Sequence, residues 1–199
     1  HARLTRQLAL RGTREIVGHS RPIETLRRRI VQLAEADHTV LIHGESGTGK
    51  QMAARVLHDC GPRGYRPLVA VDCALLTAAH LERELFGDAA TPGFGGGAAR
   101  RGRLELAAGG RLVLLNIDEM ALMLQADLAQ ALREKRFRRL GATDYRSFDA
   151  QIVSTTRFDL SHHARQGLFR EDLLDEIAEA TVTMPPLREC RDDIATLTE

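Results

Sequence analysis

The most chemically informative stretch of the chain is a glycine-rich turn with a lysine near its end. Residues 44–51 read Gly-Glu-Ser-Gly-Thr-Gly-Lys-Gln, and the mostly apolar residues 39–43 come directly before them. A strand, a glycine-rich turn and a helix in this order direct backbone N–H groups at one point, where the helix dipole favours negative charge. Lys50 is placed to reach the β- and γ-phosphates of a nucleotide. The stretch therefore predicts a phosphate-binding loop; the alternative is a plain glycine-rich turn that feeds a helix.

The last position of the turn departs from the usual motif. A serine or threonine there supplies a hydroxyl to the magnesium ion that accompanies the nucleotide, but this chain has Gln51. We therefore expect ATP or ADP as the cofactor, with magnesium bound weakly or not at all, and we assign no metal ligand. The residues expected to bind the nucleotide are Gly44, Glu45, Ser46, Gly47, Thr48, Gly49, Lys50 and Gln51.

Strand-like and helix-like segments alternate along the chain, as they do in parallel sheets covered by helices. Ser20 is a candidate N-cap for a first helix whose apolar stripe begins at Ile23. Strands are predicted at 39–43, 68–71, 112–115, 152–155 and 180–184. Further helices are predicted at 76–86, 100–107, 121–134 and 169–177. The pattern predicts an α/β P-loop fold with a five-stranded parallel sheet and helices on both faces.

The composition is that of an ordinary globular protein. The 199 residues carry 28 basic and 27 acidic side chains, a net charge of +1, so overall charge gives no reason for binding to nucleic acid or membranes. Three widely spaced cysteines fit neither a disulfide framework nor a metal knuckle. No apolar run approaches the ~20 residues that span a bilayer, and no signal peptide is visible. We expect a cytoplasmic protein without membrane contact.

Several motifs together resemble the central AAA+ domain of bacterial enhancer-binding proteins, which activate sigma-54 RNA polymerase. They are the turn at 44–50, Glu84-Leu85-Phe86-Gly87, Gly102-Arg103, Gly109-Gly110, Phe169-Arg170-Glu171-Asp172-Leu173 and Pro185-Pro186-Leu187-Arg188-Glu189. The resemblance covers nearly the whole chain. It implies a P-loop ATPase fold, a homo-oligomeric ring, RNA polymerase holoenzyme as a partner, and DNA binding through a domain that is not on this chain. Residues 1–185 are then the α/β nucleotide-binding subdomain, and 186–199 begin its helical lid.

Two acidic residues that this resemblance leads us to expect are replaced. The family ends its Walker B strand in Asp-Glu, which supports magnesium and polarises the attacking water; an ungapped alignment puts Leu115 and Asn116 there. Asp118 and Glu119 follow three residues later, which along a strand is roughly 10 Å and the opposite face. We expect this acidic pair to start a helix. Its use as a displaced Walker B pair is the alternative, and we expect that use to need a slip of the strand register.

The arginines that a neighbouring subunit contributes to hydrolysis in this family are only partly kept. The first matches Arg170, a candidate arginine finger, but the second aligns with Glu176, which we expect to repel the γ-phosphate. The sensor position, where the family usually has asparagine or histidine, is Arg157. These changes together predict weak or absent hydrolysis.

The loop with which this family grips sigma-54 aligns with residues 91–96. Only Gly95 matches the family in register, and the aromatic Phe94 stands one position late. Pro92 and the neighbouring glycines leave the segment poorly preorganised. We therefore expect this chain to have lost its contact with sigma-54.

Three functions are consistent with these residues. The first is a regulatory or oligomerisation module of a sigma-54-type transcriptional regulator that binds nucleotide but is deficient in hydrolysis. The second is an active ATPase that remodels sigma-54 RNA polymerase with Asp118 and Glu119. The third is a domain that responds to cyclic di-GMP, because Arg14 and Arg55 match arginines used by a branch of the family that binds it. Magnesium-dependent turnover separates the first two.

Overall fold

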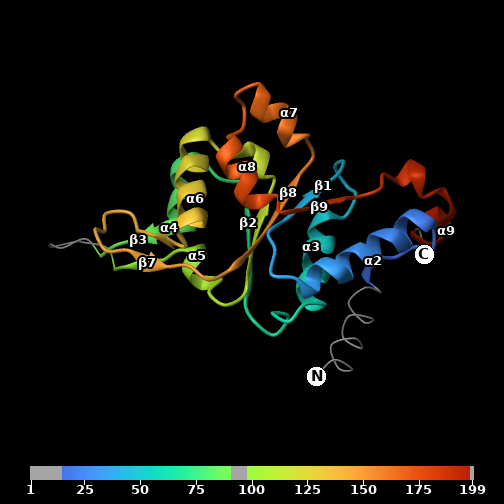
Figure 1. The fold of residues 1–199 in the computed structure, drawn as a ribbon, viewed down its shortest axis with the longest axis horizontal. Helices are drawn as coiled ribbons and strands as arrows, with labels where there is room; N and C mark the ends of the chain where they lie inside the picture. The colour runs from blue at the N-terminus through green and yellow to red at the C-terminus, as the bar shows by residue number, and fades with distance from the viewer. Residues whose placement is uncertain (1–14, 91–97, 198–199) are drawn as a thin grey trace.

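The computed structural model describes residues 15–90 and 98–197, and its centre is a parallel sheet of five strands in the order β2-β5-β8-β1-β9 (Figure 1). The strands are β1 (Val40–His43), β2 (Leu68–Asp72), β5 (Arg111–Leu115), β8 (Gln151–Thr156) and β9 (Ala180–Thr183). All five predicted strands are confirmed, and each end lies within one residue of its predicted position. The three middle strands, β5, β8 and β1, are mostly buried on both faces, which explains why apolar residues follow one another within them instead of alternating with polar ones.

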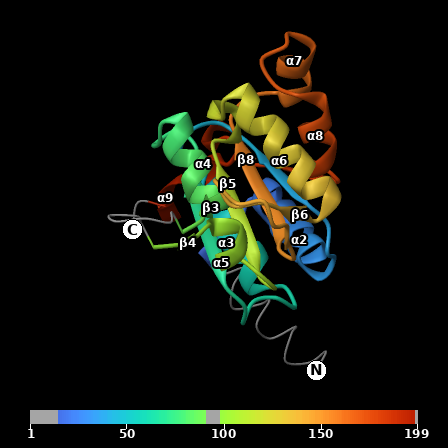
Figure 2. The ribbon, with the colours of Figure 1, turned by 90° about the vertical axis from the view of Figure 1, so that its left-hand side faces the viewer.

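Helices cover both faces of this sheet. On one face lie α2 (Arg21–Glu35) and α3 (Lys50–Asp59); on the other lie α4 (Ala78–Phe86), α5 (Arg103–Leu106), α6 (Leu122–Glu134) and α8 (Glu171–Ile177), with the short α7 (Leu160–Arg165) before α8 (Figure 1). Figure 2 looks onto the layer of α4 and α6, with the sheet behind it. The structure therefore confirms the three-layer α/β fold.

Alternate residues of the central strands feed two separate cores. Val40 and Ile42 of β1 pack with the α2 and α3 side, whereas Leu41 between them packs with the α4, α6 and α8 side. This division follows from the two-residue period of a strand, because successive side chains point to opposite faces. The register of β1 is thus fixed by burial on both sides, and with it the point at which the chain leaves the sheet toward residue 44.

One predicted helix is shorter than expected. Residues 100–101 pair as β4 (Arg100–Arg101) with β3 (Gly87–Asp88), and α5 begins only at Arg103. Gly102 explains the break, because a Cβ atom there would lie 2.3 Å from the carbonyl oxygen of Leu85. Sequence reasoning also missed a second small antiparallel pair, β6 (Arg136–Phe137) with β7 (Arg146–Ser147). The prediction for 91–96 lies outside the described residues.

The predicted cap of α2 works differently from expectation. Ser20 is the N-cap residue, but its side chain accepts no capping hydrogen bond. The carboxylate of Asp193 instead accepts from the amide of Ser20 at 2.9 Å and from that of His19. Asp193 belongs to a C-terminal segment that follows β9 beside α2 (Figure 1), with the 3-10 turns η3 (Leu187–Glu189) and η4 (Arg191–Asp193) and the helix α9 (Ile194–Leu197). That residues 186–199 begin a helical lid stays a prediction.

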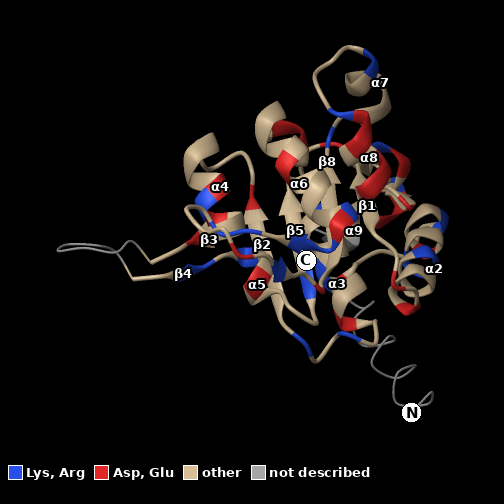
Figure 3. Ribbon diagram, turned by 60° about the vertical axis from the view of Figure 1, so that its left-hand side comes forward, with Lys and Arg blue, Asp and Glu red and all other residues tan. Residues whose placement is uncertain are grey.

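In the view of Figure 3, basic and acidic positions are mixed over most elements. Within the described ranges, no helix is both long and apolar enough to cross a membrane.

Candidate functional site

The predicted phosphate-binding loop lies at the carboxyl end of β1, where the strand ends at His43 and α3 begins at Lys50. Gly47 and Gly49 have φ angles of 80° and 84°, in the left-handed region that glycine adopts without strain. A Cβ atom at Gly47 would meet no other atom within 4 Å, so the space beside this residue is open. The first amides of α3 have no partners within the helix, and the helix dipole adds positive potential. The cradle fits a phosphate group.

The lysine of the loop is folded back onto its own backbone. Lys50 Nζ donates to the carbonyl oxygens of Gly44 at 2.7 Å and Glu45 at 2.8 Å. Burial lowers the pKa of Lys50; the carboxylate of Asp118 raises it, and the positive charge of Arg157 lowers it further. Three charged side chains from three different parts of the chain therefore meet at this loop.

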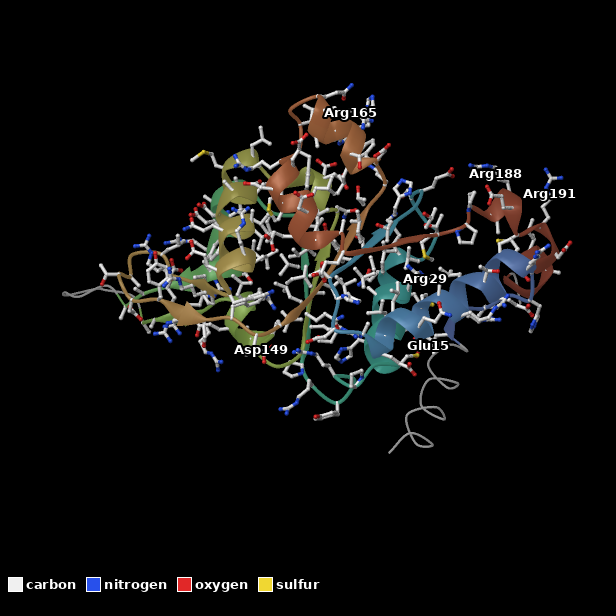
Figure 4. The ribbon with its side chains drawn as sticks, in the orientation of Figure 1. Glu15, Arg29, Asp149, Arg165, Arg188 and Arg191 are labelled. Atoms are coloured by element: carbon white, nitrogen blue, oxygen red, sulfur yellow. The ribbon has the colours of Figure 1, made fainter. Side chains whose placement is uncertain are left out.

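The loop is also tied to the C-terminal segment. Arg188 forms two hydrogen bonds with the carboxylate of Glu45, at 2.7 and 2.8 Å, and this pairing lowers the pKa of Glu45. Figure 4 labels Arg188 in the segment beyond β9, on the side of the molecule where α2 lies. Both side chains are largely exposed, so the pair contributes little to stability but fixes where this segment meets the loop.

No carboxylate stands at the end of β5, where the resemblance implies two. Leu115 is the last residue of the strand and pairs with Asp72 of β2. Asn116 has a left-handed backbone, with φ 52° and ψ 51°, and its side-chain amide donates to Asp72 Oδ1 at 2.8 Å. The side-chain amide of Asn116 is therefore bound to the neighbouring strand β2 and is not free to hold a water molecule at the phosphate-binding loop.

The structure corrects our expectation that Asp118 needs a register slip to reach the loop. The left-handed Asn116 ends the strand, and the 3-10 turn η2 (Ile117–Glu119) folds the chain back. Thr156 Oγ1 then donates to Asp118 Oδ1 at 2.5 Å. Thr156 ends β8, and its carbonyl oxygen accepts from the amide of Gly44 at 3.1 Å, so the bond brings this carboxylate to the edge of the sheet where the loop begins. The distance along a straight strand was the wrong measure, because the chain turns after Leu115.

Glu119, the second residue of the acidic pair, contacts Arg157, the residue at the predicted sensor position. An Nη atom of Arg157 donates to Glu119 Oε1 at 3.2 Å. As expected from sequence, the two acids lie in a helical turn, but it is a 3-10 turn separate from α6, which starts at Leu122. Among the described residues, no group of three or more histidine, cysteine, aspartate or glutamate side chains is arranged to hold a metal ion.

The resemblance assigns two positions to a neighbouring subunit: Arg170 is the N-cap residue of α8, and Glu176 lies within that helix. Both make ion pairs within the chain. Arg170 forms two hydrogen bonds with Asp172, at 2.9 and 2.8 Å, which raise the pKa of the guanidinium. Glu176 Oε1 lies 3.3 Å from Nε of Arg133 on α6. The negative charge of Glu176 is therefore partly balanced within its own subunit. Whether Arg170 reaches a neighbouring loop stays a prediction.

Among the described hydrogen bonds and ion pairs, none joins the side chain of Arg55 to the loop. Gln51, at the end of the loop, is the second residue of α3, and Arg55 lies four residues further along the helix; both side chains are exposed. Arg14 lies outside the described residues. The cyclic di-GMP hypothesis thus gains no geometric support here.

Sequence reasoning missed two parts of the site, Asp72 and Thr156. The signal that could have found them is position: both end strands of a parallel sheet, and the carboxyl ends of parallel strands meet at one edge where ligands bind. Their hydrogen-bond partners, Asn116 and Asp118, could not be found from strand position, because the positions of both side chains depend on the backbone turn after β5.

Fold and loop together define the class of protein: a P-loop nucleoside triphosphatase fold, with the phosphate cradle between β1 and α3. Residues 16–183 match the family described as the sigma-54 interaction domain. This chain therefore belongs to the family of sigma-54 interaction domains.

Relatives and solved structures agree with this assignment. The transcriptional regulatory protein ZraR of Klebsiella oxytoca is 40% identical over 182 residues, which are 92% of this chain and 41% of ZraR. The Nif-specific regulatory protein of Bradyrhizobium diazoefficiens is 38% identical over 196 residues, 98% of this chain and 33% of the relative. The crystal structure of NtrX from Brucella abortus in complex with ATP superimposes with a TM-score of 0.84 at 33% identity, covering 92% of this chain and 39% of NtrX. The chain thus spans about two fifths or less of the length of these relatives.

Proposed function

We propose that this chain is the central nucleotide-binding domain of a bacterial transcriptional regulator of the sigma-54 activator family, deficient in ATP hydrolysis. The observation that carries the proposal is the end of β5, where Leu115 offers no charge and the amide of Asn116 is held by Asp72. Phosphoryl transfer depends almost entirely on positioned charge, so the loss of both carboxylates removes metal support and the water-orienting group together. The domain then serves as a regulatory or oligomerisation module.

Nucleotide binding is retained in this proposal. The open turn at Gly47, the first amides of α3 and the ammonium of Lys50 supply donors for the phosphates of ATP or ADP. NtrX has been crystallised in complex with ATP and with ADP, and its chain superimposes on most of this one. The magnesium that accompanies ATP would find neither the usual hydroxyl at Gln51 nor a carboxylate at Leu115, so we propose that it contributes little.

The partners follow from the family. We propose a homo-oligomeric assembly, RNA polymerase holoenzyme as the partner, and DNA binding through a domain not on this chain. The loss of sigma-54 contact rests on the sequence of residues 91–96 alone, which lie outside the described residues.

A second candidate function is an active ATPase that uses Asp118 and Glu119. The observation that favours it is that Asp118, held by Thr156, acts on Lys50 electrostatically. A carboxylate beside the phosphate loop is the chemistry that a magnesium-bound nucleotide needs. In this second function, the carboxylates of Asp118 and Glu119 in the turn η2 take the place of the two that are absent from the end of β5.

Steady-state turnover with magnesium separates the two functions. We expect the unmodified chain to hydrolyse ATP far below ~1 s⁻¹, the lower end for phosphoryl-transfer enzymes. Calorimetry on the same sample must show that nucleotide binds, so that a low rate is not the result of an empty site. A rate near ~1 s⁻¹ that disappears in Asp118→Ala would establish the second function and overturn the first.

A further inference from the structure

Five arginines gather at the end of the molecule that lies opposite α2, around β4 and β7 (Figures 1 and 3). Each forms an ion pair with one of two glutamates, Glu84 of α4 or Glu105 of α5. The members of this arginine cluster are Arg100, Arg101, Arg103, Arg139 and Arg146. Because α4 and α5 pack against each other, the two glutamates bring all five guanidiniums to one surface.

The two glutamates lie beneath the arginines. Glu84 accepts from Arg100 and, at 2.8 Å, from Nε of Arg103. Glu105 accepts from Arg139 at 2.6 and 2.7 Å. Only 18% of the Glu84 side chain and 10% of the Glu105 side chain are exposed, whereas 40% to 62% is exposed for every arginine of the cluster except Arg139. The side chains that solvent meets on this surface are therefore mainly guanidiniums.

Positive charge exceeds negative charge on this surface. Hydrogen bonds from arginines of the cluster lower the pKa of both Glu84 and Glu105, so both acids are ionised at neutral pH. Asp144, which lies 3.6 Å from one arginine of the cluster, is the third acid that contacts it among the described residues. The neighbouring Arg83 and Asp88 pair with each other at 3.3 Å and cancel. Five arginines against three acids leave an excess of two positive charges, which attracts an anionic partner.

Arg146 and Arg101 keep N–H donors for a further acceptor. The guanidinium of Arg146 makes no hydrogen bond among the described residues, since its contacts with Glu105 and Asp144 are longer, at 3.9 and 3.6 Å. Arg101 lies 3.6 Å from the carboxylate of Glu105 and donates to the backbone oxygen of that residue at 3.5 Å. A guanidinium has five N–H donors. Because these contacts are long and both guanidiniums are exposed, an incoming anion can take the remaining donors.

We propose that the arginine cluster binds the phosphate backbone of double-stranded DNA without reading its sequence. A planar guanidinium matches two phosphate oxygens at once, and phosphate contacts carry no sequence information. The glutamates already hold part of the cluster in place, so less side-chain freedom is lost on binding. The choice of DNA among polyanions rests on the proposed function, in which a domain that is not on this chain holds the regulator on DNA and raises the effective concentration of duplex at the cluster. The central domain would then add a second, weaker contact with DNA.

Fluorescence anisotropy with a fluorescein-labelled DNA duplex of mixed sequence, in the absence of nucleotide, tests the inference. We expect the unmodified chain to bind with a Kd of about 10⁻⁴ to 10⁻⁶ M, the range for sequence-independent binding. The logarithm of the binding constant should fall with the logarithm of the salt concentration, with a slope of about −3.6. Each arginine of the cluster other than the nearly buried Arg139 contributes about −0.9 to this slope.

A double variant removes two of these contacts. Arg101→Gln combined with Arg146→Gln should halve the slope and weaken DNA binding about 10- to 100-fold at ~0.1 M salt. Arg101→Lys combined with Arg146→Lys keeps both charges and should keep the slope. Unchanged DNA binding in the glutamine variant would overturn the inference, and so would a lack of binding by the unmodified chain at ~50 mM salt.

The matched control removes two exposed arginines from α2, Arg28→Gln combined with Arg29→Gln; Figure 4 labels Arg29 on this helix. The control lowers the net charge by the same amount and should change neither the affinity nor the slope. Thermal melts followed by circular dichroism should show each variant folded. An equal loss of DNA binding in the control would mean that net charge, and not the cluster, drives binding, and would overturn the inference.

Competition and nucleotide binding complete the test. Poly-glutamate that displaces the labelled duplex as effectively as unlabelled DNA of equal charge would assign the cluster to an acidic protein and overturn the inference. ATP and ADP affinities, measured by calorimetry on the same samples, should be equal in all variants, because no member of the cluster contacts the phosphate-binding loop among the described residues. Loss of DNA binding alone would thus leave the proposed function standing, whereas a lack of nucleotide binding alone would contradict the proposed function only.

Discussion

The carboxylate of Asp118 accepts a 2.5 Å hydrogen bond from Thr156 Oγ1, across 38 positions of sequence. Thr156 ends β8 beside the phosphate-binding loop, whereas Asp118 lies in the turn after β5. The bond therefore ties two strand ends together and places a negative charge near Lys50. This geometry gives Asp118 two competing roles: it can support Lys50 only, or it can act for the missing Walker B acids.

Removing the carboxylate of Asp118 separates these roles. If it only supports Lys50, Asp118→Ala should leave ATP and ADP affinities within about threefold of the original values, a change of well under 1 kcal/mol, because the backbone cradle and the lysine remain. Calorimetry with and without magnesium measures this. Asp118→Asn, which keeps an acceptor for Thr156 but no charge, is the control. A magnesium-dependent preference for ATP that vanishes in both variants would mean that the acid binds the metal.

Removing the ammonium of Lys50 should abolish most nucleotide binding. Lys50→Ala leaves the loop amides but takes away the cation that reaches the terminal phosphates, so we expect affinity to fall at least ~10- to 100-fold. The matched control is Arg29→Ala, an exposed arginine on α2 that Figure 4 labels on that helix. Binding that survives in Lys50→Ala would place the nucleotide elsewhere on the chain.

We expect ATP hydrolysis to return only when the two acids absent from the end of β5 and an arginine at position 176 are introduced together. Leu115→Asp or Asn116→Glu alone should change turnover little, whereas the two together with Glu176→Arg should raise it by ~10²-fold or more, because catalytic parts act as a unit. Leu115 pairs with Asp72, and Glu176 with Arg133, so each change also places like charges side by side. Melting curves must therefore accompany the rates. A single variant that matched the triple variant would contradict this account.

A fully buried arginine, Arg111, stabilises the edge of the sheet opposite the phosphate-binding loop. Arg111, at the start of β5, donates to the carbonyl oxygens of Leu57 and Ala34 and to the side chain of Gln151. Burial lowers its pKa to about 10, so it stays charged at neutral pH. Arg111→Ala should lower the free energy of unfolding by about 3 kcal/mol or more, because it opens a cavity and leaves buried acceptors unpaired. Urea denaturation measures this against the exposed Arg28→Ala, for which we expect a change within about 0.5 kcal/mol.

Acid should weaken the fold through Glu105. Hydrogen bonds from Arg139, at 2.6 and 2.7 Å, hold the pKa of this carboxyl below its ordinary value of 4.5. An acid with a lowered pKa in the folded state stabilises the fold above its unfolded pKa, and this stabilisation is lost as the pH falls through the folded pKa. Glu105→Gln should therefore destabilise the chain at neutral pH and flatten the decline of unfolding free energy below about pH 4.5. If the unfolding free energy declined equally steeply in the unmodified chain and in Glu105→Gln, the acid sensitivity would belong to other carboxyl groups.

The central sheet and the phosphate-binding loop could both be predicted from the amino-acid sequence. Strand ends were predicted to within one residue, because buried parallel strands read as short apolar runs bounded by turn residues. The loop was readable because its geometry is local: glycines, a lysine and the start of a helix follow one another between residues 44 and 51. The late start of α5 and the two-residue strands could not be read in this way, since each depends on a partner outside its own segment.

The side chains around the phosphate-binding loop, in contrast, are placed by tertiary contacts. Counting residues along a straight strand put Asp118 out of reach, but the left-handed Asn116 turns the chain and Thr156 holds the carboxylate near Lys50. The same turn gives Glu119 to Arg157, a pairing that no local pattern predicts. The physical reason is that a backbone conformation at one residue redirects the following side chains, and their charges act on neighbours through space, whereas periodicity and spacing report only on contacts within one element.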